Sequence, residues 1–452
     1  MRQPMWQAAV LFAVALLLGG GGSQAGLANL CVQLVALALL AFNLPSVITF
    51  FSAAPRAVAV LVGLTLLVPL AQSVPLPPAL WQALPAREFA TASLELVDAQ
   101  GSWMPFSLNV RRTLVAFFAL MPALAALVLL WQLPERHLRK VLLAVALAGG
   151  FVVLLGAQQL AMGNRKLVFF AQVYGSTDLQ GTFANHNSAG LFLDIALCAL
   201  VGALPTRLGK PAAYLGAAIL AALLLVGVVL TKSRSSMALL VVPAALFVLQ
   251  AFRIWASSGI SRRGVYAALG GCVLVVAGIA ALAFTNERVE ASLSRFDDLQ
   301  DARGAIWSDS LGAAGRFWPL GAGVGTFDEV FQASETLETL SPGRAGRAHN
   351  DYLELTIESG LVGIALALGW LALLAAVCFK GLRTGGPALA SVGTFALFAL
   401  QSILDYPMRN QTLLCLAGLM LALALRTLSN DRAEGGRAQE GQGQTRMGTK
   451  LQ

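Results

Sequence analysis

Long runs of apolar residues dominate the chain, and they constrain its fold more than any other feature. Each run holds about 20 residues, the length that an α-helix needs to cross the hydrocarbon core of a bilayer. Backbone groups in lipid must bond to each other, so long runs without alternation predict helices rather than barrel strands. The twelve predicted spans are residues 5–20, 29–51, 57–73, 113–132, 141–161, 188–205, 212–231, 236–252, 265–285, 355–379, 387–404 and 412–427.

The composition excludes the main alternatives to a membrane protein. Of 452 residues, 57% are hydrophobic and 12% are charged, whereas a soluble domain carries about 25% charged residues. This hydrophobicity excludes a disordered chain. The five cysteines fall within the predicted spans without a CxxC motif, which argues against a disulfide framework or a metal role. We predict an all-α polytopic membrane protein, with a transmembrane helical domain over residues 1–427 and a disordered cytoplasmic tail over residues 428–452.

The charges of the connecting segments predict the orientation. Lys and Arg concentrate in the segments that are cytoplasmic if the N-terminus lies inside, as the positive-inside rule requires. Both termini are then cytoplasmic. The net charge of +8 is therefore a topology signal rather than a nucleic-acid footprint, and we expect no nucleic-acid partner. One alternative is that the first span is a signal peptide, because Arg2, an apolar core and a small-residue ending at Ala25 fit that pattern.

Three predicted outer segments are too long to be simple connectors. They cover residues 74–112, 162–187 and 286–354, the last being inserted between the ninth and tenth spans. Two short turns, TKSRSS (231–236) and DYPMRNQ (405–411), carry charge at the same face. Loops on a rigid helical frame are the usual location of functional sites, so we expect the chemistry here.

His349 stands where the largest loop enters the tenth span. Asp351, Glu354 and Glu358 follow at spacings that place them on one helical face. Such a face needs partners at the membrane boundary. A histidine near cations and carboxylates is suited to act as a general base at neutral pH. The alternative is a structural histidine with satisfied hydrogen bonds.

Two other polar groups adjoin predicted spans. GTFANHNSAG contains Asn185 and Asn187, and two interpretations are open. In one, the two asparagines contact a ligand. In the other, Asn187 or Ser188 caps the helix that follows. Lys232 and Arg234 lie in TKSRSS between two apolar runs. They are either snorkelling cations or functional charges at the membrane boundary.

Two further motifs resemble cofactor or metal sites but are interpreted as structural. GAGVG (321–325) has the wrong spacing for a dinucleotide loop and no preceding strand, so we interpret it as a turn that lets backbones approach closely. Asp297, Asp298 and Asp301 resemble a magnesium-binding DDxxD motif, but a single copy on a polar helix favours a solvated face. We expect neither a metal nor a cofactor.

Basic residues placed on the outer side against the positive-inside rule suggest a bound anion. The planar fork of arginine suits phosphate oxygens, so a lipid phosphate or diphosphate at the membrane boundary is the expected ligand. These residues are Arg111, Arg112, Arg165, Lys166, Lys232, Arg234, Arg303, Arg316, Arg344, Arg347 and Arg409.

Taken together, five motifs resemble the O-antigen ligase/polymerase superfamily. In chain order, they are GTFANHNSAG, SRSS, the Arg303-x-x-x-Trp307 pair, GAGVGTF and AHNDYLELTIESG. The resemblance is most specific over residues 162–236 and 303–361. It implies a GT-C glycosyltransferase of the bacterial inner membrane that moves a glycan from undecaprenyl diphosphate to an acceptor sugar at the periplasmic face. The acceptor of a ligase is lipid A-core, and such enzymes use neither nucleotide sugar nor metal.

The resemblance also implies roles for individual residues. His349 takes the proton of the acceptor hydroxyl, and Arg234, followed by Arg303, neutralises the leaving diphosphate. The remaining candidates for substrate binding are Arg112, Arg165, Lys232, Asn185, Asn187, Asn350, Asp351 and Glu354. Asp351 or Glu354 is also the candidate to orient His349.

Two alternative functions stay open. A polysaccharide polymerase of the same superfamily differs in its acceptor, which is another undecaprenyl-linked repeat. A lipid-linked glycan flippase or transporter would place ionisable residues near the middle of its spans. Here charge collects at the outer rim, with Asp194 as the main exception, which favours chemistry at the membrane surface.

Overall fold

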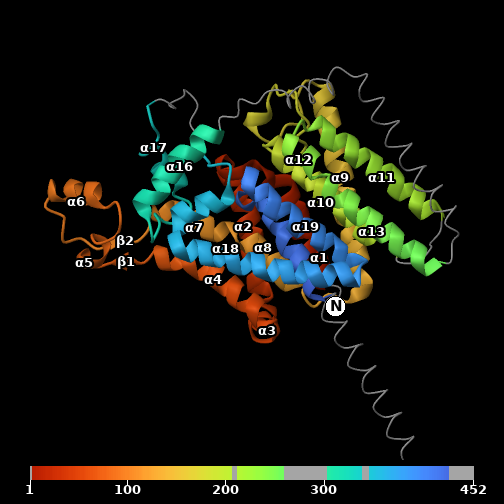
Figure 1. Ribbon diagram of the computed structural model, residues 1–452, viewed down its shortest axis with the longest axis horizontal. Helices are drawn as coiled ribbons and strands as arrows, with labels where there is room; N and C mark the ends of the chain where they lie inside the picture. Colours follow the sequence, from red (N-terminus) through yellow and green to blue (C-terminus); the bar gives the residue numbers. More distant parts are fainter. Residues whose placement is uncertain (1–2, 206–210, 259–302, 338–345, 427–452) are drawn as a thin grey trace, which may run out of the picture.

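In the computed structural model, the regular secondary structure of the described residues is helical apart from two short strands (Figure 1). The structure describes residues 3–205, 211–258, 303–337 and 346–426. The predicted span 265–285, residues 286–302 and 338–345 of the largest loop, and the tail from residue 428 lie outside the described residues. The elements are α1 (Gln3–Leu18), η1 (Gly19–Gln24), α2 (Gly26–Phe42), α3 (Leu44–Ala53), α4 (Arg56–Gln72), β1 (Pro75–Leu76), α5 (Pro78–Trp81), α6 (Glu88–Glu95), β2 (Met104–Pro105), α7 (Val110–Ala119), α8 (Met121–Leu130), η2 (Glu135–His137), α9 (Leu138–Ala161), η3 (Ala171–Val173), α10 (His186–Ala203), α11 (Pro211–Leu230), α12 (Arg234–Leu239), α13 (Val241–Ser258), α16 (Arg303–Phe317), α17 (Phe327–Gln332), α18 (Asp351–Thr384), α19 (Pro387–Leu404) and η5 (Pro407–Arg409), followed by a helix over Gln411–Arg426.

The apolar runs form helices, as predicted. Eight of the twelve predicted spans are helices long and apolar enough to cross a membrane. A ninth, 29–51, reaches that length only if the bent pair α2 and α3 is taken as one span. Two more, α4 and Gln411–Arg426, are shorter apolar helices. The predicted span 29–51 is bent by 79° between α2 and α3. Pro45 explains this break, because a proline lacks the N–H of a helical hydrogen bond and its ring clashes with the preceding turn.

Helix α10 occupies the centre of the bundle. It packs against α9, α11, α13 and α19, and 16 of its 18 residues are buried, from Asn187 to Gly202. Gly202 allows close packing against α19, since a Cβ atom there would lie 2.8 Å from that of Ala390. A helix this enclosed holds the residues at its N-terminus in fixed positions, which matters for the site described below.

The first helix is an integral part of this bundle. Helix α1 packs against α2 and α8, with Leu11 and Ala15 fully buried. Its end continues into η1, where the carbonyl of Gly20 accepts a hydrogen bond from the backbone N–H of Ala184 at 3.0 Å. The first predicted span therefore contributes to the same end of the molecule as the 162–187 loop.

The segments predicted to face outward meet at one end of the bundle. Backbone hydrogen bonds join Leu179 of the second loop to Leu230 at the end of α11, and Leu108 of the first loop to Ala322 of the third, both at 2.9 Å. Within the first loop, β1 and β2 pair as a short antiparallel ladder beside α5 and α6. This small lobe extends from the left of the molecule in Figure 1.

The glycine-rich stretch 321–325 is a turn of close backbone approach, as predicted. Gly321 and Gly323 have φ values of +88° and +114°. A Cβ atom on Gly321 would lie 2.6 Å from the backbone of Glu358, so a larger residue does not fit. The turn donates hydrogen bonds from Ala322 and Gly323 to the carbonyls of Ile357 and Glu358. It thereby fixes the large loop against the first part of α18, just before that helix is interrupted at Gly360.

Candidate active site

His349 forms a pair with Asp405, a residue of the short turn after α19. The imidazole Nδ1 lies 3.1 Å from Oδ1 of Asp405, and the ring of Tyr406 packs edge-on against the imidazole at 5.0 Å between centroids. The histidine side chain is 32% exposed, whereas that of Asp405 is 4% exposed. If Nδ1 carries the proton and donates a hydrogen bond to the carboxylate, the lone pair of Nε2 is left for an incoming hydroxyl group.

The two residues that precede His349 are held in place by α16 and α18. The N–H of Ala348 donates to Glu354 at 2.9 Å, and its carbonyl accepts a hydrogen bond from Trp307 Nε1 at 2.8 Å. Arg347 forms an ion pair with Glu354 at 3.1 Å. His349 itself has φ +51°, an unfavourable conformation for a non-glycine residue. Such strain persists only where the surroundings enforce it, and it is concentrated at functional sites.

The acidic face of α18 binds the largely buried side chain of Arg409, which lies in the turn after α19. Arg409 lies 2.7 Å from Glu358, 3.3 Å from Glu354 and 3.8 Å from Asp351. Burial acts to lower the pKa of Arg409, but the three carboxylates raise it above its ordinary value. The guanidinium therefore stays charged and joins α18 to the turn that carries Asp405.

This arrangement corrects two expectations from spacing. Asp405, and not Asp351 or Glu354, is the carboxylate at the imidazole. Asp351 is buried and accepts hydrogen bonds from Ser402 and the backbone of Met408, while Glu354 is fully buried between two arginines. Both acids hold the framework of the site instead of lining its surface. Helical spacing placed them on one face, but it does not show which way that face turns.

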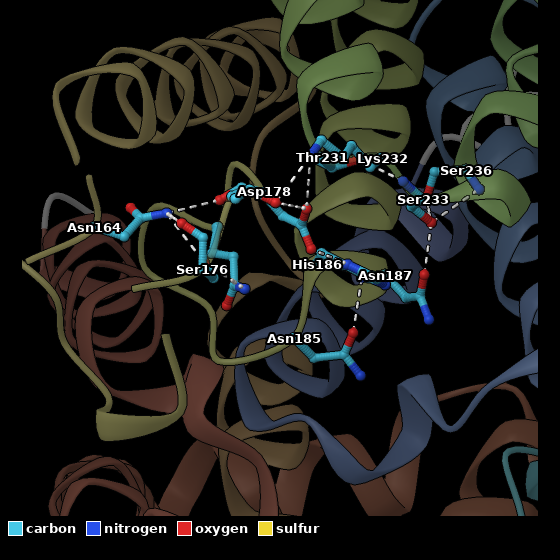
Figure 2. A network of polar contacts seen from close by, with 12 residues as sticks. Asn164, Ser176, Asp178, Asn185, His186, Asn187, Thr231, Lys232, Ser233 and Ser236 are labelled. Carbon is cyan, nitrogen blue, oxygen red and sulfur yellow. Dashed lines mark hydrogen bonds and ion pairs between the residues drawn. The ribbon is translucent and has the colours of Figure 1, made fainter. Parts of the chain in front are cut away.

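The N-terminus of α10 connects Tyr406, which packs against His349, to the turn before α12. Asn185 caps α10 by accepting a hydrogen bond from the N–H of Asn187 at 2.8 Å (Figure 2). The amide of Asn185 also donates to the hydroxyl of Tyr406 at 3.2 Å. Asn187 accepts a hydrogen bond from Ser233 at 2.8 Å. The cap is thus Asn185 and not Asn187 or Ser188, and both asparagines have a structural role at the site.

A second histidine–carboxylate pair lies in the same network. His186 Nδ1 lies 2.8 Å from Asp178, and Lys232 lies 3.5 Å from the other oxygen of that carboxylate. Lys232 also donates to Thr177 at 2.9 Å and has φ +55°. Figure 2 shows these side chains in a row from the 162–187 loop to Ser233 and Ser236. The loop therefore positions a lysine and a histidine next to α12.

The predicted arginines at the starts of α12 and α16 lie at this end of the bundle. Arg234 is the first residue of α12 and is half-buried. Ser235, the next residue, accepts a hydrogen bond from Gln401 at 3.1 Å, and Gln401 precedes Asp405 by one helical turn. Arg303 begins α16, one turn before Trp307 and on the same face. Asn350 caps α18 by accepting a hydrogen bond from the N–H of Leu353.

Two predicted ligands have other surroundings. Arg112 forms ion pairs with Asp328 and Glu329, both at 3.2 Å, which fasten α17 to α7. Arg165 is exposed in the 162–187 loop. The structure brings neither into the network around His349. Asp297, Asp298 and Asp301 lie outside the described residues.

Sequence reasoning missed several members of the site. Asp405 and Tyr406 lie in a turn that stands out in the sequence only for its charge, and Asp178 and His186 belong to a loop in which the asparagines stand out. The signal that could have found them is the combination of ionisable side chains in each short outer turn. Nothing in their spacing pairs Asp405 with a histidine 56 residues away.

A comparison with protein families identifies part of the chain. Residues 219–368 match the family model Wzy_C, described as O-antigen ligase. The matched region contains Lys232, Arg234, Arg303 and His349. No curated protein matches the chain. The predicted resemblance to the O-antigen ligase/polymerase superfamily is therefore confirmed over residues 219–368, the part of the chain that matches the family model.

Proposed function

We propose that this protein is a glycosyltransferase that moves a glycan from undecaprenyl diphosphate to an acceptor sugar, most simply O-antigen onto lipid A-core. The observation that carries the proposal is the His349–Asp405 pair, which adjoins a network containing Lys232 and His186 at one end of a helical membrane bundle. The family match supports ligase or polymerase chemistry in general.

The proposed reaction is a direct displacement. The acceptor hydroxyl oxygen bonds to the anomeric carbon of the donor glycan while the bond from that carbon to the diphosphate oxygen breaks. The hydroxyl proton passes to Nε2 of His349, and undecaprenyl diphosphate leaves with the bonding electrons. Displacement from the opposite face inverts the anomeric centre.

The charges of the site support this reaction. Asp405 fixes the tautomer of His349 and stabilises the imidazolium that forms, because its carboxylate lies at Nδ1. The diphosphate needs no proton if cations neutralise the charge that develops on its oxygen. We assign this role first to Arg234, then to Arg303, with Lys232 and His186 binding the phosphates. Removing one such contact often costs about 2.7–4 kcal/mol of barrier.

The amides have a supporting role. Asn185 and Asn187 hold Tyr406 and Ser233, so they position the two halves of the site relative to each other. Asn350 caps the helix that follows His349 and retains an amide N–H₂ group for a sugar hydroxyl. The loop end is assigned to the periplasmic side of the inner membrane, with both termini in the cytoplasm, from the distribution of Lys and Arg.

The test is transfer by purified protein in liposomes that contain an undecaprenyl-diphosphate-linked glycan and lipid A-core. We expect transfer by the wild type and none by His349→Ala. The matched control is His137→Ala, which removes a histidine from η2, beyond the described site. Normal transfer by His349→Ala would refute the base assignment, and no transfer by the wild type to any acceptor would refute the function.

A polymerase of the same superfamily is the second candidate, since the family match covers both activities. The glycans of a deletion strain separate the two. Loss of a ligase leaves full-length polymer on undecaprenyl diphosphate, whereas loss of a polymerase leaves single repeats.

A further inference from the structure

A groove between α16 and α18 is lined in part by Asn350, the residue that follows His349 in the chain, and its other lining residues have no part in the proposed displacement. It has a volume of about 290 Å³. Ligand sites are typically concave, largely apolar and equipped with a few polar groups. The lining residues are Trp307, Leu311, Asn350, Tyr352, Leu353 and Thr356.

The groove and the catalytic histidine share their supports. Asn350 directly follows His349 in the chain, and Ala348 directly precedes it. Trp307 donates a hydrogen bond to the carbonyl of Ala348. Tyr352 is fixed in turn, because its hydroxyl donates to the carbonyl of Ala399 at 3.0 Å. The two aromatic side chains are therefore held in place before any ligand binds, which lowers the entropic cost of binding.

Of the cations of the site, Arg303 lies on α16 one helical turn before Trp307, whereas Lys232 lies along a different set of contacts. His349 leads through Tyr406 and Asn185 to the network that contains Lys232. None of the six residues that line the groove carries a carboxylate, an ammonium or a guanidinium group. The groove is thus unsuited to a diphosphate, whereas the apolar C–H faces of a sugar ring stack on aromatic side chains and its hydroxyls bond to an amide such as that of Asn350.

We propose that the α16–α18 groove is the acceptor subsite and binds a neutral sugar ring of the acceptor glycan, with Trp307 and Tyr352 as the stacking surfaces. This inference rests on the proposed function. A base must touch the hydroxyl that it deprotonates, so the acceptor belongs at the surface next to His349, while the diphosphate is held through the cationic network. A volume of about 290 Å³ accommodates one or two pyranose rings.

The test fills the groove without changing its aromatic residues. Leu311 is 64% exposed on α16, so Leu311→Trp adds bulk there with little effect on the core. The matched control is Leu337→Trp, which makes the same change at a leucine that is 85% exposed and does not line the groove. Thermal melting of both variants shows that they fold.

Two probes are titrated against the detergent-solubilised protein: deacylated core oligosaccharide, which carries the sugars of the acceptor without acyl chains, and undecaprenyl diphosphate. We expect Leu311→Trp to weaken oligosaccharide binding at least tenfold and to leave undecaprenyl diphosphate binding unchanged. Unchanged oligosaccharide binding would overturn the inference. So would weaker undecaprenyl diphosphate binding, because the groove would then hold the lipid chain of the donor.

A second variant tests the subsite without adding an indole to the groove. Tyr352→Leu removes a stacking ring and keeps an apolar side chain, and it is expected to weaken oligosaccharide binding in the same direction; an unchanged affinity would count against the subsite. The proposed function is tested separately, because transfer by the wild type is measured without any groove variant. Transfer by the wild type together with normal oligosaccharide binding by Leu311→Trp refutes the subsite alone.

Discussion

Asp405 lies 3.1 Å from Nδ1 of His349, although 56 residues separate the two in the chain. The pair joins the largest loop to the turn after α19, and the nearly complete burial of the carboxylate keeps solvent from competing for the contact. A histidine oriented in this way has one ring nitrogen committed to the protein and one left for substrate.

Asp405→Asn is expected to reduce glycan transfer about 100- to 10,000-fold, the range typical of a lost acid–base contribution. The amide cannot stabilise an imidazolium as a carboxylate does. The measurement is the initial rate of transfer in liposomes at saturating donor. Glu95→Gln, at an exposed position on α6, is the control and should retain full activity. A normal rate for Asp405→Asn would show that the pair is only structural.

Lys232→Ala is expected to weaken binding of the lipid diphosphate donor about tenfold or more, because a hydrogen bond to a charged group contributes roughly 1.5–3 kcal/mol. Lys232→Arg should retain most of the affinity. The KM for donor is the measurement, with Lys166→Ala as the control, since Lys166 is exposed in the 162–187 loop. An unchanged KM in Lys232→Ala would remove this residue from the donor site.

Ionisation of Tyr406 is expected to lower the stability of the folded protein at alkaline pH. Burial and the neighbouring Asp405 carboxylate raise the pKa of Tyr406 to about 12, from an ordinary value of 10.0. Between these two values the unfolded chain binds fewer protons than the folded one, so stability falls as the pH rises. We expect the melting temperature to fall less steeply above pH 10 in Tyr406→Phe. Tyr174→Phe, at a 63% exposed position, should match the wild type.

Arg409→Met is expected to destabilise the protein by about 3–5 kcal/mol, because the buried carboxylates of Asp351 and Glu358 lose this cation while Glu354 keeps Arg347. Thermal unfolding in detergent measures the effect. Arg383→Met is the comparison, since Arg383 is exposed over the ring of Phe379, where a cation–π contact contributes about 0.5–1 kcal/mol. Equal shifts for the two variants would contradict the assigned role of Arg409.

Chelation is expected to leave transfer unchanged, because the proposed leaving group is stabilised by protein cations. The measurement is the rate of transfer with EDTA in excess over protein. Strong inhibition that Mg²⁺ reverses would contradict this mechanism. It would also direct attention to Asp297, Asp298 and Asp301.

The sequence alone predicted the helical membrane fold and the end of the bundle at which polar segments gather. Apolar runs leave a chain little choice in lipid, since each run must satisfy its own backbone hydrogen bonds. The same reasoning did not predict that the span 29–51 is broken at Pro45, because membrane helices often tolerate a proline. It did foresee that the glycines at 321–325 let two backbones approach, because close approach is a local property of glycine.

The partners of each polar side chain were decided by tertiary structure. Spacing put Asp351, Glu354 and Glu358 on one helical face, yet only packing shows that this face binds Arg409 while Asp405 reaches His349. Asn185 and Tyr406 likewise meet across 221 residues of chain. Periodicity is set by the geometry of a single helix, whereas a contact between two elements depends on how every intervening helix packs, and that information is spread over the whole chain.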